Sequence, residues 1–161
     1  MKKILKLSIV LLGALFVLLG CRSESKSVFV LQTEHSKVTY TYVYDKGNDE
    51  VLSLTTDVVV RLSGVQEFAT ATRQKRDELV NQMKDIEGVK VTTSDGENAI
   101  GFAIEIDVKK FKLDDAESRE KAPSFYQTMD TALIKKDDKV SFSASKESVE
   151  RLGLEEQKEE K

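Results

Sequence analysis

Hydrophobic residues are unevenly distributed along the chain, and the first twenty residues stand apart from the rest. Residues 1–6 are basic, with three lysines and no acid, and residues 7–20 are apolar or glycine apart from Ser8. After Cys21 the chain turns abruptly polar. A basic start, a short apolar run and a small residue are typical of a secretory signal peptide. The run is shorter than the roughly 18–20 residues of a membrane-spanning helix, so we expect the segment to be cleaved.

Three segments typical of β-strands follow the polar residues 22–27. Residues 27–34 are rich in β-branched side chains, residues 37–45 alternate between apolar and polar, and residues 50–60 alternate again after a turn at residues 45–49. Alternation with period two predicts strands with one buried face, and the short connections favour an antiparallel meander. The residues expected to share one face of the third strand are Leu52, Leu54, Thr56, Val58 and Val60.

Tyr40, Tyr42 and Tyr44 form an aromatic stripe on one face of the second predicted strand. If this face meets a helix, the stripe belongs to the core; if it faces solvent, it is a contact surface suited to a peptide or a glycan. We favour the core, because the helix predicted next presents Phe68 and Leu79, which need an apolar partner surface.

Residues 63–88 predict an amphipathic helix of about twenty residues lying across the sheet. Ser63 and Gln66 match a capping box at its start, and Gly88 supplies its stop. The expected buried stripe consists of Phe68, Thr72, Leu79, Met83 and Ile86.

A hairpin is predicted next, because residues 89–94 and 98–108 flank Asp95-Gly96, two residues that tolerate positive φ. The second strand alternates cleanly. Its expected inward residues are Ile100, Phe102, Ile104, Ile106 and Val108.

The pattern weakens after this hairpin. Residues 114–121 predict a short helix that Pro123 ends, and residues 146–152 predict a last helix with Ser145 as its cap and Gly153 as its end. The stretch between the two helices gives no clear prediction.

The order βββ, helix, ββ, then short helical pieces predicts an α+β fold with a largely antiparallel sheet and one long amphipathic helix packed on it. The predicted organisation is a signal peptide at 1–20, a lipidated flexible tether at 21–27, a single domain at 28–154 and a charged, frayed tail at 155–161.

The charge of the chain argues against nucleic acid as a partner. The chain has 25 basic and 28 acidic residues, and removal of the three lysines in residues 1–20 leaves 22 against 28, a net charge of −6. Binding to nucleic acid rests on neutralising phosphates, and the domain has no basic cluster for that purpose.

Cys21, the only cysteine, follows Leu18-Leu19-Gly20 at the polar edge of the apolar run. An exported protein rarely keeps one exposed lone thiol, because it would oxidise or pair between molecules. This position resembles the lipobox of bacterial lipoproteins. The resemblance implies that Cys21 receives a diacylglyceryl group, that signal peptidase II cuts before it, and that the mature protein is held on the extracytoplasmic face of the cell membrane by fatty acids such as palmitate.

The chain as a whole resembles the YehR-like family of small bacterial lipoproteins, a domain of unknown function. The order and spacing of five segments carry the resemblance: Leu18 to Cys21, Thr39 to Tyr42, Leu52 to Thr56, Phe68 to Val89, and Ser148 to Leu152. The family brings no catalytic residues to this chain. Residues 109–144 are harder to match, so their structure stays open.

Two candidate sites for catalysis are present. His35, the only histidine, lies in a polar turn, and without a second histidine or a free thiolate we interpret it as a solvated turn residue. Glu105 and Asp107 share the outward face of a strand about 6.6 Å apart, a separation suited to acid–base chemistry on a glycoside. Acids on a wet strand face are far more often simply solvated, which is the interpretation we favour.

One candidate cation site surrounds Gly47. Calcium prefers oxygen ligands, but the spacing matches no EF-hand loop, and a turn alone explains the composition. The residues offering oxygen ligands are Asp45, Asn48, Asp49 and Glu50.

We therefore expect a membrane-anchored lipoprotein with no cofactor, metal site or catalytic residue, and with Cys21 as its lipid attachment site. Three functions compete: a non-catalytic module that binds an envelope protein or a small ligand, an envelope hydrolase that uses carboxylates, and an accessory subunit of a transporter or sensor. A pocket with two converging acids would favour the hydrolase, and a large exposed apolar patch would favour the accessory subunit.

Overall fold

The computed structural model describes residues 23–62 and 66–158. The helices are α1 (Gln66–Met83), α2 (Ala116–Lys121), α3 (Pro123–Ala132) and α4 (Phe142–Arg151). The strands are β1 (Glu24–Gln32), β2 (Ser36–Asp45), β3 (Glu50–Arg61), β4 (Val89–Asp95), β5 (Ala99–Asp107), β6 (Lys135–Lys136), β7 (Lys139–Val140) and β8 (Glu155–Gln157). The α+β class and the order βββ-α-ββ are confirmed.

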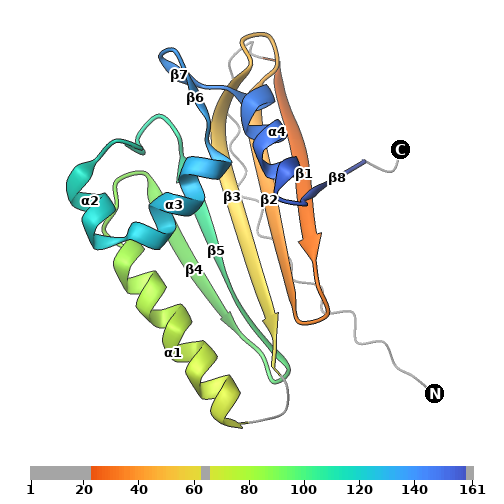
Figure 1. The fold of residues 1–161 in the computed structure, drawn as a ribbon, viewed down its shortest axis with the longest axis vertical. Coiled ribbons are helices and arrows are strands. Elements are labelled where there is room, and N and C mark those ends of the chain that lie inside the picture. Colours follow the sequence, from red (N-terminus) through yellow and green to blue (C-terminus); the bar gives the residue numbers. More distant parts are fainter. Residues whose placement is uncertain (1–22, 63–65, 159–161) are drawn as a thin grey trace.

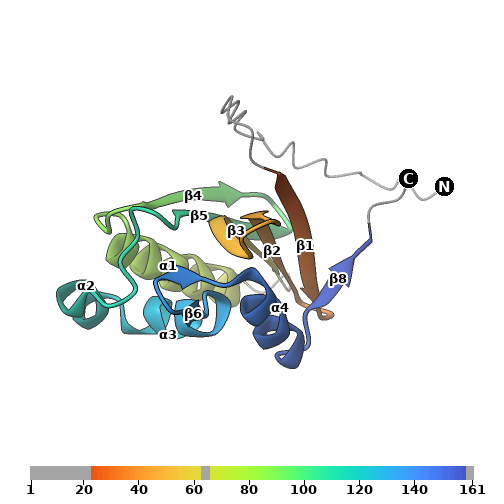
Figure 2. The same ribbon diagram turned by 90° about the horizontal axis from the view of Figure 1, so that it is seen from above.

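A six-stranded antiparallel sheet forms the body of the molecule, with the order β4-β5-β3-β2-β1-β8 (Figure 1). All four described helices lie on one side of it, so the other face of the sheet has no helix over it among the described residues (Figure 2). The chain runs β1-β2-β3 as the predicted meander. Helix α1 then carries it to the edge strand β4, and β5 returns between β4 and β3.

The face of the sheet under the helices is the core. Tyr40 and Tyr42 are buried there, and Tyr42 is 0% exposed, which confirms the core interpretation for both. Tyr44 is only partly buried and stacks on Phe142 of α4, with ring centroids 3.6 Å apart and an interplanar angle of 6°. Tyr42 also donates a hydrogen bond of 2.7 Å to the Ala132 carbonyl of α3, so the aromatic stripe packs against the carboxyl-terminal helices.

A β-bulge in β3 changes which of its residues face the core. Val43 pairs with Ser53 but Tyr44 pairs with Val51, so Leu52 is an extra residue in the ladder. The prediction that Leu52 shares the buried face with Leu54 is wrong, because the bulge breaks the alternation and Val51 is buried instead.

Helix α1 packs on the sheet through its carboxyl-terminal half. Met83 is buried, as is Ile86 just beyond the helix, and Gly88 follows with φ +78° as predicted for the stop. Phe68, expected in the buried stripe, is 44% exposed. Phe68 is the third residue of α1, and the first turns of this helix extend past the β4–β5 hairpin (Figure 1). The predicted cap Ser63 lies outside the described residues.

The β4–β5 hairpin is confirmed, although its turn works differently from the prediction. Neither Asp95 nor Gly96 has positive φ. A backbone hydrogen bond of 2.9 Å from Gly96 to the carbonyl of Ala99 closes a longer loop instead. The alternation of β5 is confirmed for Ile100, Ile104 and Ile106, which are buried, and for Phe102 and Val108, which pack partly buried against the core.

The carboxyl-terminal region differs most from prediction. Helix α2 ends at Lys121, as predicted, but Pro123 is also the first residue of a further helix, α3. Helix α4 begins four residues earlier than expected, capped by Ser141, whose side chain accepts from the amide of Ala144. Ser145 is instead a buried helix residue that donates to the Ser141 carbonyl at 2.7 Å and accepts from Ile134 at 2.9 Å. Gly153 ends the helix with φ +91°, as predicted.

Both predicted flexible ends are partly strand. Residues 24–27, assigned to the tether, begin β1 and pair with residues 42–45 of β2. Residues 155–157, assigned to the frayed tail, form β8 and pair with residues 28–30 of β1. Local composition predicted disorder in both places, but the edge of the sheet supplies hydrogen-bond partners for their backbones.

No helix within residues 23–62 and 66–158 is long and apolar enough to cross a membrane.

Candidate functional site

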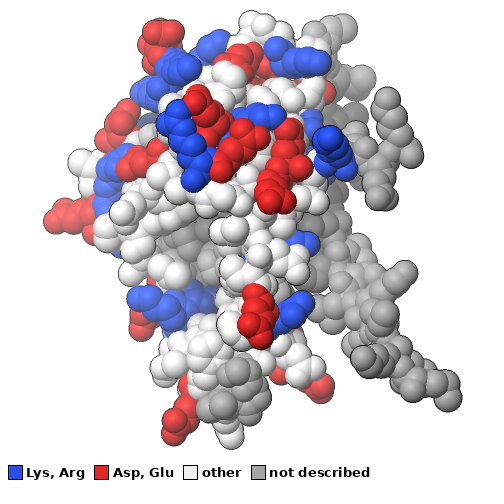
Figure 3. Space-filling model, turned by 45° about the vertical axis from the view of Figure 1, so that its right-hand side comes forward, with Lys and Arg blue, Asp and Glu red and all other residues white. Residues whose placement is uncertain are grey.

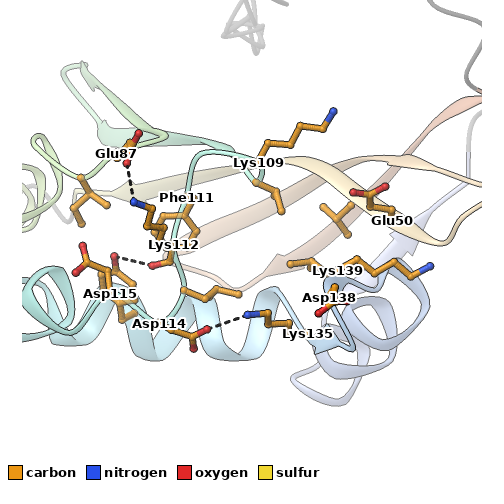
Figure 4. Close-up of a pocket in the computed structure, with 16 residues that line it drawn as sticks. Glu50, Glu87, Lys109, Phe111, Lys112, Asp114, Asp115, Lys135, Asp138 and Lys139 are labelled. Atoms are coloured by element: carbon orange, nitrogen blue, oxygen red, sulfur yellow. Dashed lines mark hydrogen bonds and ion pairs between the residues drawn. The ribbon is translucent and has the colours of Figure 1, made fainter.

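A pocket of about 630 Å³ opens at one end of the sheet (Figure 4). Five segments surround it: the start of β3 after the β2–β3 turn, the α1–β4 connection, the loop from β5 to α2, helix α3, and the β6–β7 hairpin. This volume lies within the range of small-molecule sites. We call it the end pocket; it is lined by Glu50, Val51, Ile86, Glu87, Val108, Lys109, Phe111, Lys112, Leu113, Asp114, Asp115, Tyr126, Lys135, Asp138, Lys139 and Val140.

The floor of the end pocket is apolar and firmly held. Phe111 and Tyr126 are buried and stack with centroids 5.4 Å apart, and Val51 is buried beside them in the same core. Burial raises the pKa of the Tyr126 phenol, and its hydroxyl donates to the Lys112 carbonyl at 3.4 Å. The floor is therefore continuous with the hydrophobic core and gives an apolar ligand a rigid surface.

Gly88 brings two walls of the pocket together. Its φ of +78° lies in the left-handed region that favours glycine. A Cβ at this position would lie 2.6 Å from the amide nitrogen of Phe111 and 3.0 Å from the carbonyl oxygen of Asp107. Only a glycine lets the chain beside Glu87 approach the β5–α2 loop so closely.

The rim of the end pocket carries both signs of charge. Lys112 pairs with Glu87 at 3.6 Å, and Lys135 pairs with Asp114 at 3.0 Å. All four side chains are more than half exposed, so each pair contributes little to stability. Four lysines face five carboxylates around the pocket, and no single-sign field arises. Figure 3 shows the same mixture of red and blue over the end of the molecule that carries α4 and the β6–β7 hairpin.

Five rim charges have no ion pair among the described residues: Glu50, Lys109, Asp115, Asp138 and Lys139. The Lys139 ammonium donates to the backbone carbonyl of Asn48 in the β2–β3 turn. Asp115 accepts a hydrogen bond from Ser118, so Glu50, Lys109 and Asp138 are the charged groups of the pocket that are most available to a ligand.

Asp49 fixes the β2–β3 turn against α4. Its carboxylate accepts from the Ser143 amide at 2.8 Å, from the Ser143 hydroxyl at 2.8 Å and from the Ser141 hydroxyl at 2.6 Å. Partial burial acts to raise its pKa, but these hydrogen bonds and the charge of Lys139 outweigh burial and hold the pKa below its usual value. Asp49 thus caps a helix that lies far from it in sequence.

The predicted oxygen ligands around Gly47 have these structural roles in place of a cation site. Asp45 is buried, and its carboxylate accepts from the amide of Gly47 at 2.9 Å and from the side chain of Asn48 at 2.8 Å. Asp49 turns away to α4, so the oxygens do not converge. Within the described ranges, no group of three or more His, Cys, Asp or Glu residues is arranged to hold a metal ion.

Glu105 and Asp107 lie on the face of β5 opposite the buried Ile104 and Ile106, away from the end pocket. Glu105 pairs with Lys90 at 3.4 Å, and Asp107 accepts from the amide of Lys109 at 3.1 Å. The two acids lie on the face without helices and do not line the pocket, which a carboxylate mechanism would require.

His35 lies in the β1–β2 turn with a side chain 74% exposed, 3.9 Å from Glu34. Its interpretation as a solvated turn residue is confirmed. The end pocket, by contrast, was not predicted. It draws on the region 109–144, where the only signal was Phe111 and Leu113 among charged residues.

Cys21 lies outside the described residues. The described chain begins two residues later at Ser23, whose carbonyl accepts a hydrogen bond of 3.3 Å from the amide of Lys46 in the β2–β3 turn. The same turn leads into Glu50 of the end pocket. The first described residue and the end pocket therefore lie at the same end of the sheet.

Comparison with known proteins gives a fold and no activity. The structure is similar to the NMR structure of the E. coli YehR protein, with a TM-score of 0.65 and 16% identity over 88% of this chain and 96% of that chain. It is also similar to the NMR structure of a protein from Streptococcus pneumoniae TIGR4, with a TM-score of 0.54 and 17% identity over 86% of this chain and 87% of that chain. No protein-family model and no curated protein sequence matches the chain. The chain therefore has a YehR-like fold.

Proposed function

We propose that this chain is a bacterial lipoprotein that acts as a non-catalytic binding module on the extracytoplasmic face of the cell membrane. A diacylglyceryl group on Cys21 would anchor it, and the end pocket would bind a small ligand or a segment of an envelope protein. The observation that carries the proposal is the position of the pocket. Glu50 at its rim directly follows the β2–β3 turn, and Lys46 of this turn donates a hydrogen bond to Ser23, two residues after Cys21.

The chemistry of the anchor supports stable attachment. At about 0.8 kcal/mol for each buried methylene, two long acyl chains supply on the order of 20 kcal/mol of transfer energy. Two extended residues reach at most about 7 Å, so an anchor on Cys21 would hold the β2–β3 turn close to the lipid head groups. The end pocket would then face the membrane surface.

The contents of the pocket support binding more than catalysis. Its charged groups are lysines and carboxylates on a well-exposed rim, and its floor is apolar. Glu105 and Asp107, the acids considered for hydrolysis, lie elsewhere on the sheet. An apolar floor with a few polar groups around it is the usual form of a ligand site.

The anchor is tested by expressing the full chain in bacteria with an alkyne-labelled fatty acid and comparing it with Cys21→Ala. The wild-type chain should carry the label, lose residues 1–20 and fractionate with membranes. Cys21→Ala should stay unlabelled and uncleaved, whereas the control Ser23→Ala should behave as wild type. A Cys21→Ala chain that is still labelled and matured would contradict the proposal.

A further inference from the structure

The end pocket combines two surfaces that a single ligand would have to match. Deep in the pocket, Val51, Phe111 and Val140 are buried members of the core and offer only hydrocarbon. At the rim, ammonium and carboxylate groups alternate. A purely apolar ligand would make no polar contacts with the rim. A purely polar ligand would lose its own hydration against the apolar floor without gaining hydrogen bonds there. The pocket therefore fits a molecule with one hydrocarbon part and one polar part.

The charges of the rim limit which polar head groups the pocket can bind. Glu50 and Asp138 have no ion pair among the described residues, and neither does Lys109. Figure 4 places Glu50, Asp138 and Lys139 along one side of the pocket, and Lys109 extends outward from the rim on the β5–α2 loop. A strongly anionic head group would meet the carboxylates, and a strongly cationic one would meet the lysines. A head group that carries one positive and one negative charge can satisfy both.

The position of the pocket indicates where such a molecule would come from. An anchor on Cys21 would hold the β2–β3 turn at the head-group layer of a bilayer, and Glu50 and Lys139 both adjoin this turn. Bilayer lipids, which have a hydrocarbon part and include zwitterionic head groups, would then lie directly in front of the pocket.

We propose that the end pocket binds a zwitterionic phospholipid of the bilayer, with its ammonium group on Glu50 and Asp138, its phosphate on Lys109 and Lys139, and its glycerol and upper acyl carbons on the apolar floor. This inference rests on the proposed function, because the anchor brings the pocket to the membrane. It adds the ligand class, which the anchor alone does not specify.

The test is photo-crosslinking of the full-length chain in living bacteria whose membranes contain phosphatidylethanolamine and phosphatidylglycerol. Benzoylphenylalanine replaces Leu113 in the pocket or, as a control, Leu152, which directly follows α4, is 52% exposed and does not line the pocket. Because Leu113 is partly buried, the exposed pocket residue Lys112 serves as a second position that tolerates substitution. After irradiation, the lipid adducts of the purified protein are identified by mass spectrometry.

We expect phosphatidylethanolamine adducts at Leu113 and Lys112 that are enriched over the membrane composition and about fivefold above those at Leu152. The double change Glu50→Gln and Asp138→Asn should shift the adducts towards phosphatidylglycerol, because it removes two of the five rim carboxylates and keeps all four lysines. The control Glu67→Gln on α1, away from the pocket, should leave the ratio unchanged.

Adducts that are no more frequent at Leu113 and Lys112 than at Leu152 would overturn the inference, as would adducts whose ratio follows membrane composition in every variant. Fatty-acid labelling of the same cultures separates this failure from failure of the anchor. A labelled protein without enriched pocket adducts would support the anchor on Cys21 and contradict the proposed lipid ligand. An unlabelled protein with enriched pocket adducts would support the lipid ligand and contradict the anchor on Cys21.

Discussion

Replacing Asp49 with asparagine should destabilise the fold by removing a charged cap from α4. The carboxylate accepts three hydrogen bonds of 2.6–2.8 Å from Ser141 and Ser143. Asp49 has φ +52°, a conformation that asparagine also tolerates, so this substitution tests the carboxylate and spares the backbone. The amide oxygen of asparagine can accept some of these hydrogen bonds but carries no negative charge.

The expected loss is about 1–2 kcal/mol in the free energy of unfolding. Caps of this kind contribute roughly 0.5–2 kcal/mol, and hydrogen bonds to a charged acceptor are worth about 1 kcal/mol more than neutral ones. Because Asp49 is partly exposed, we expect the loss of stability to be smaller than the summed contributions of its three hydrogen bonds. Asp137 is the matched control: it is exposed, has φ +54° and lies in the β6–β7 turn. Asp137→Asn should change stability by less than about 0.5 kcal/mol.

The pH dependence gives a second, independent readout. The folded-state pKa of Asp49 lies below its ordinary value, since the hydrogen bonds outweigh partial burial. Its stabilisation is therefore fully present above the unfolded-state pKa, near 4, and is lost as the pH falls through the lower folded-state pKa. Urea unfolding followed by circular dichroism should show a gap between wild type and Asp49→Asn at about pH 7 that closes towards about pH 2. Equal losses for Asp49→Asn and Asp137→Asn, or a gap independent of pH, would refute the reasoning.

Three further substitutions test the core and the pocket wall. Tyr42→Phe should lower the free energy of unfolding in urea by about 1–2 kcal/mol, because the buried Tyr42 hydroxyl donates to an α3 carbonyl at 2.7 Å. The control Tyr40→Phe should lower it by less than about 0.5 kcal/mol, because the Tyr40 hydroxyl has no hydrogen bond among the described residues. Equal losses would contradict this assignment. Thr56→Val should raise stability by about 1 kcal/mol, because the buried Thr56 hydroxyl has no partner within the described part of the chain; a loss in thermal unfolding would show that the hydroxyl is satisfied. Gly88→Ala should cost more than about 2 kcal/mol, because its Cβ would lie 2.6 Å from the amide nitrogen of Phe111, and a wild-type melting temperature would contradict the close approach.

Local patterns predicted the elements that local physics decides. The alternation of β5 predicted its buried isoleucines, because side chains of a strand alternate between faces wherever the ladder is regular. Gly88 was predicted to stop α1, and its φ of +78° is the conformation that requires a glycine. In β3 the same reasoning failed at Leu52, because a bulge depends on how β2 and β3 pair and leaves no mark on either strand alone.

The end pocket and the carboxyl-terminal region depend on contacts between distant residues. Asp49 determines where α4 begins by binding Ser143, so the sequence around Ser145 alone predicted the wrong cap. Strand β8 forms because the edge of β1 offers it a partner, although its own residues are polar and exposed. A pocket assembled from the start of β3, the β5–α2 loop, the β6–β7 hairpin and two further segments has no signature within any one of them.

Intact-mass spectrometry of the protein extracted from bacterial membranes tests lipid attachment most directly. We predict a polypeptide that begins at residue 21 and carries the added mass of a diacylglyceryl group on its first residue. Fragmentation should place that mass on Cys21 and leave Ser23 and all later residues unmodified. A chain that retains residues 1–20, or one that begins elsewhere with Cys21 as a free thiol, would contradict the anchor and the membrane-facing position of the end pocket.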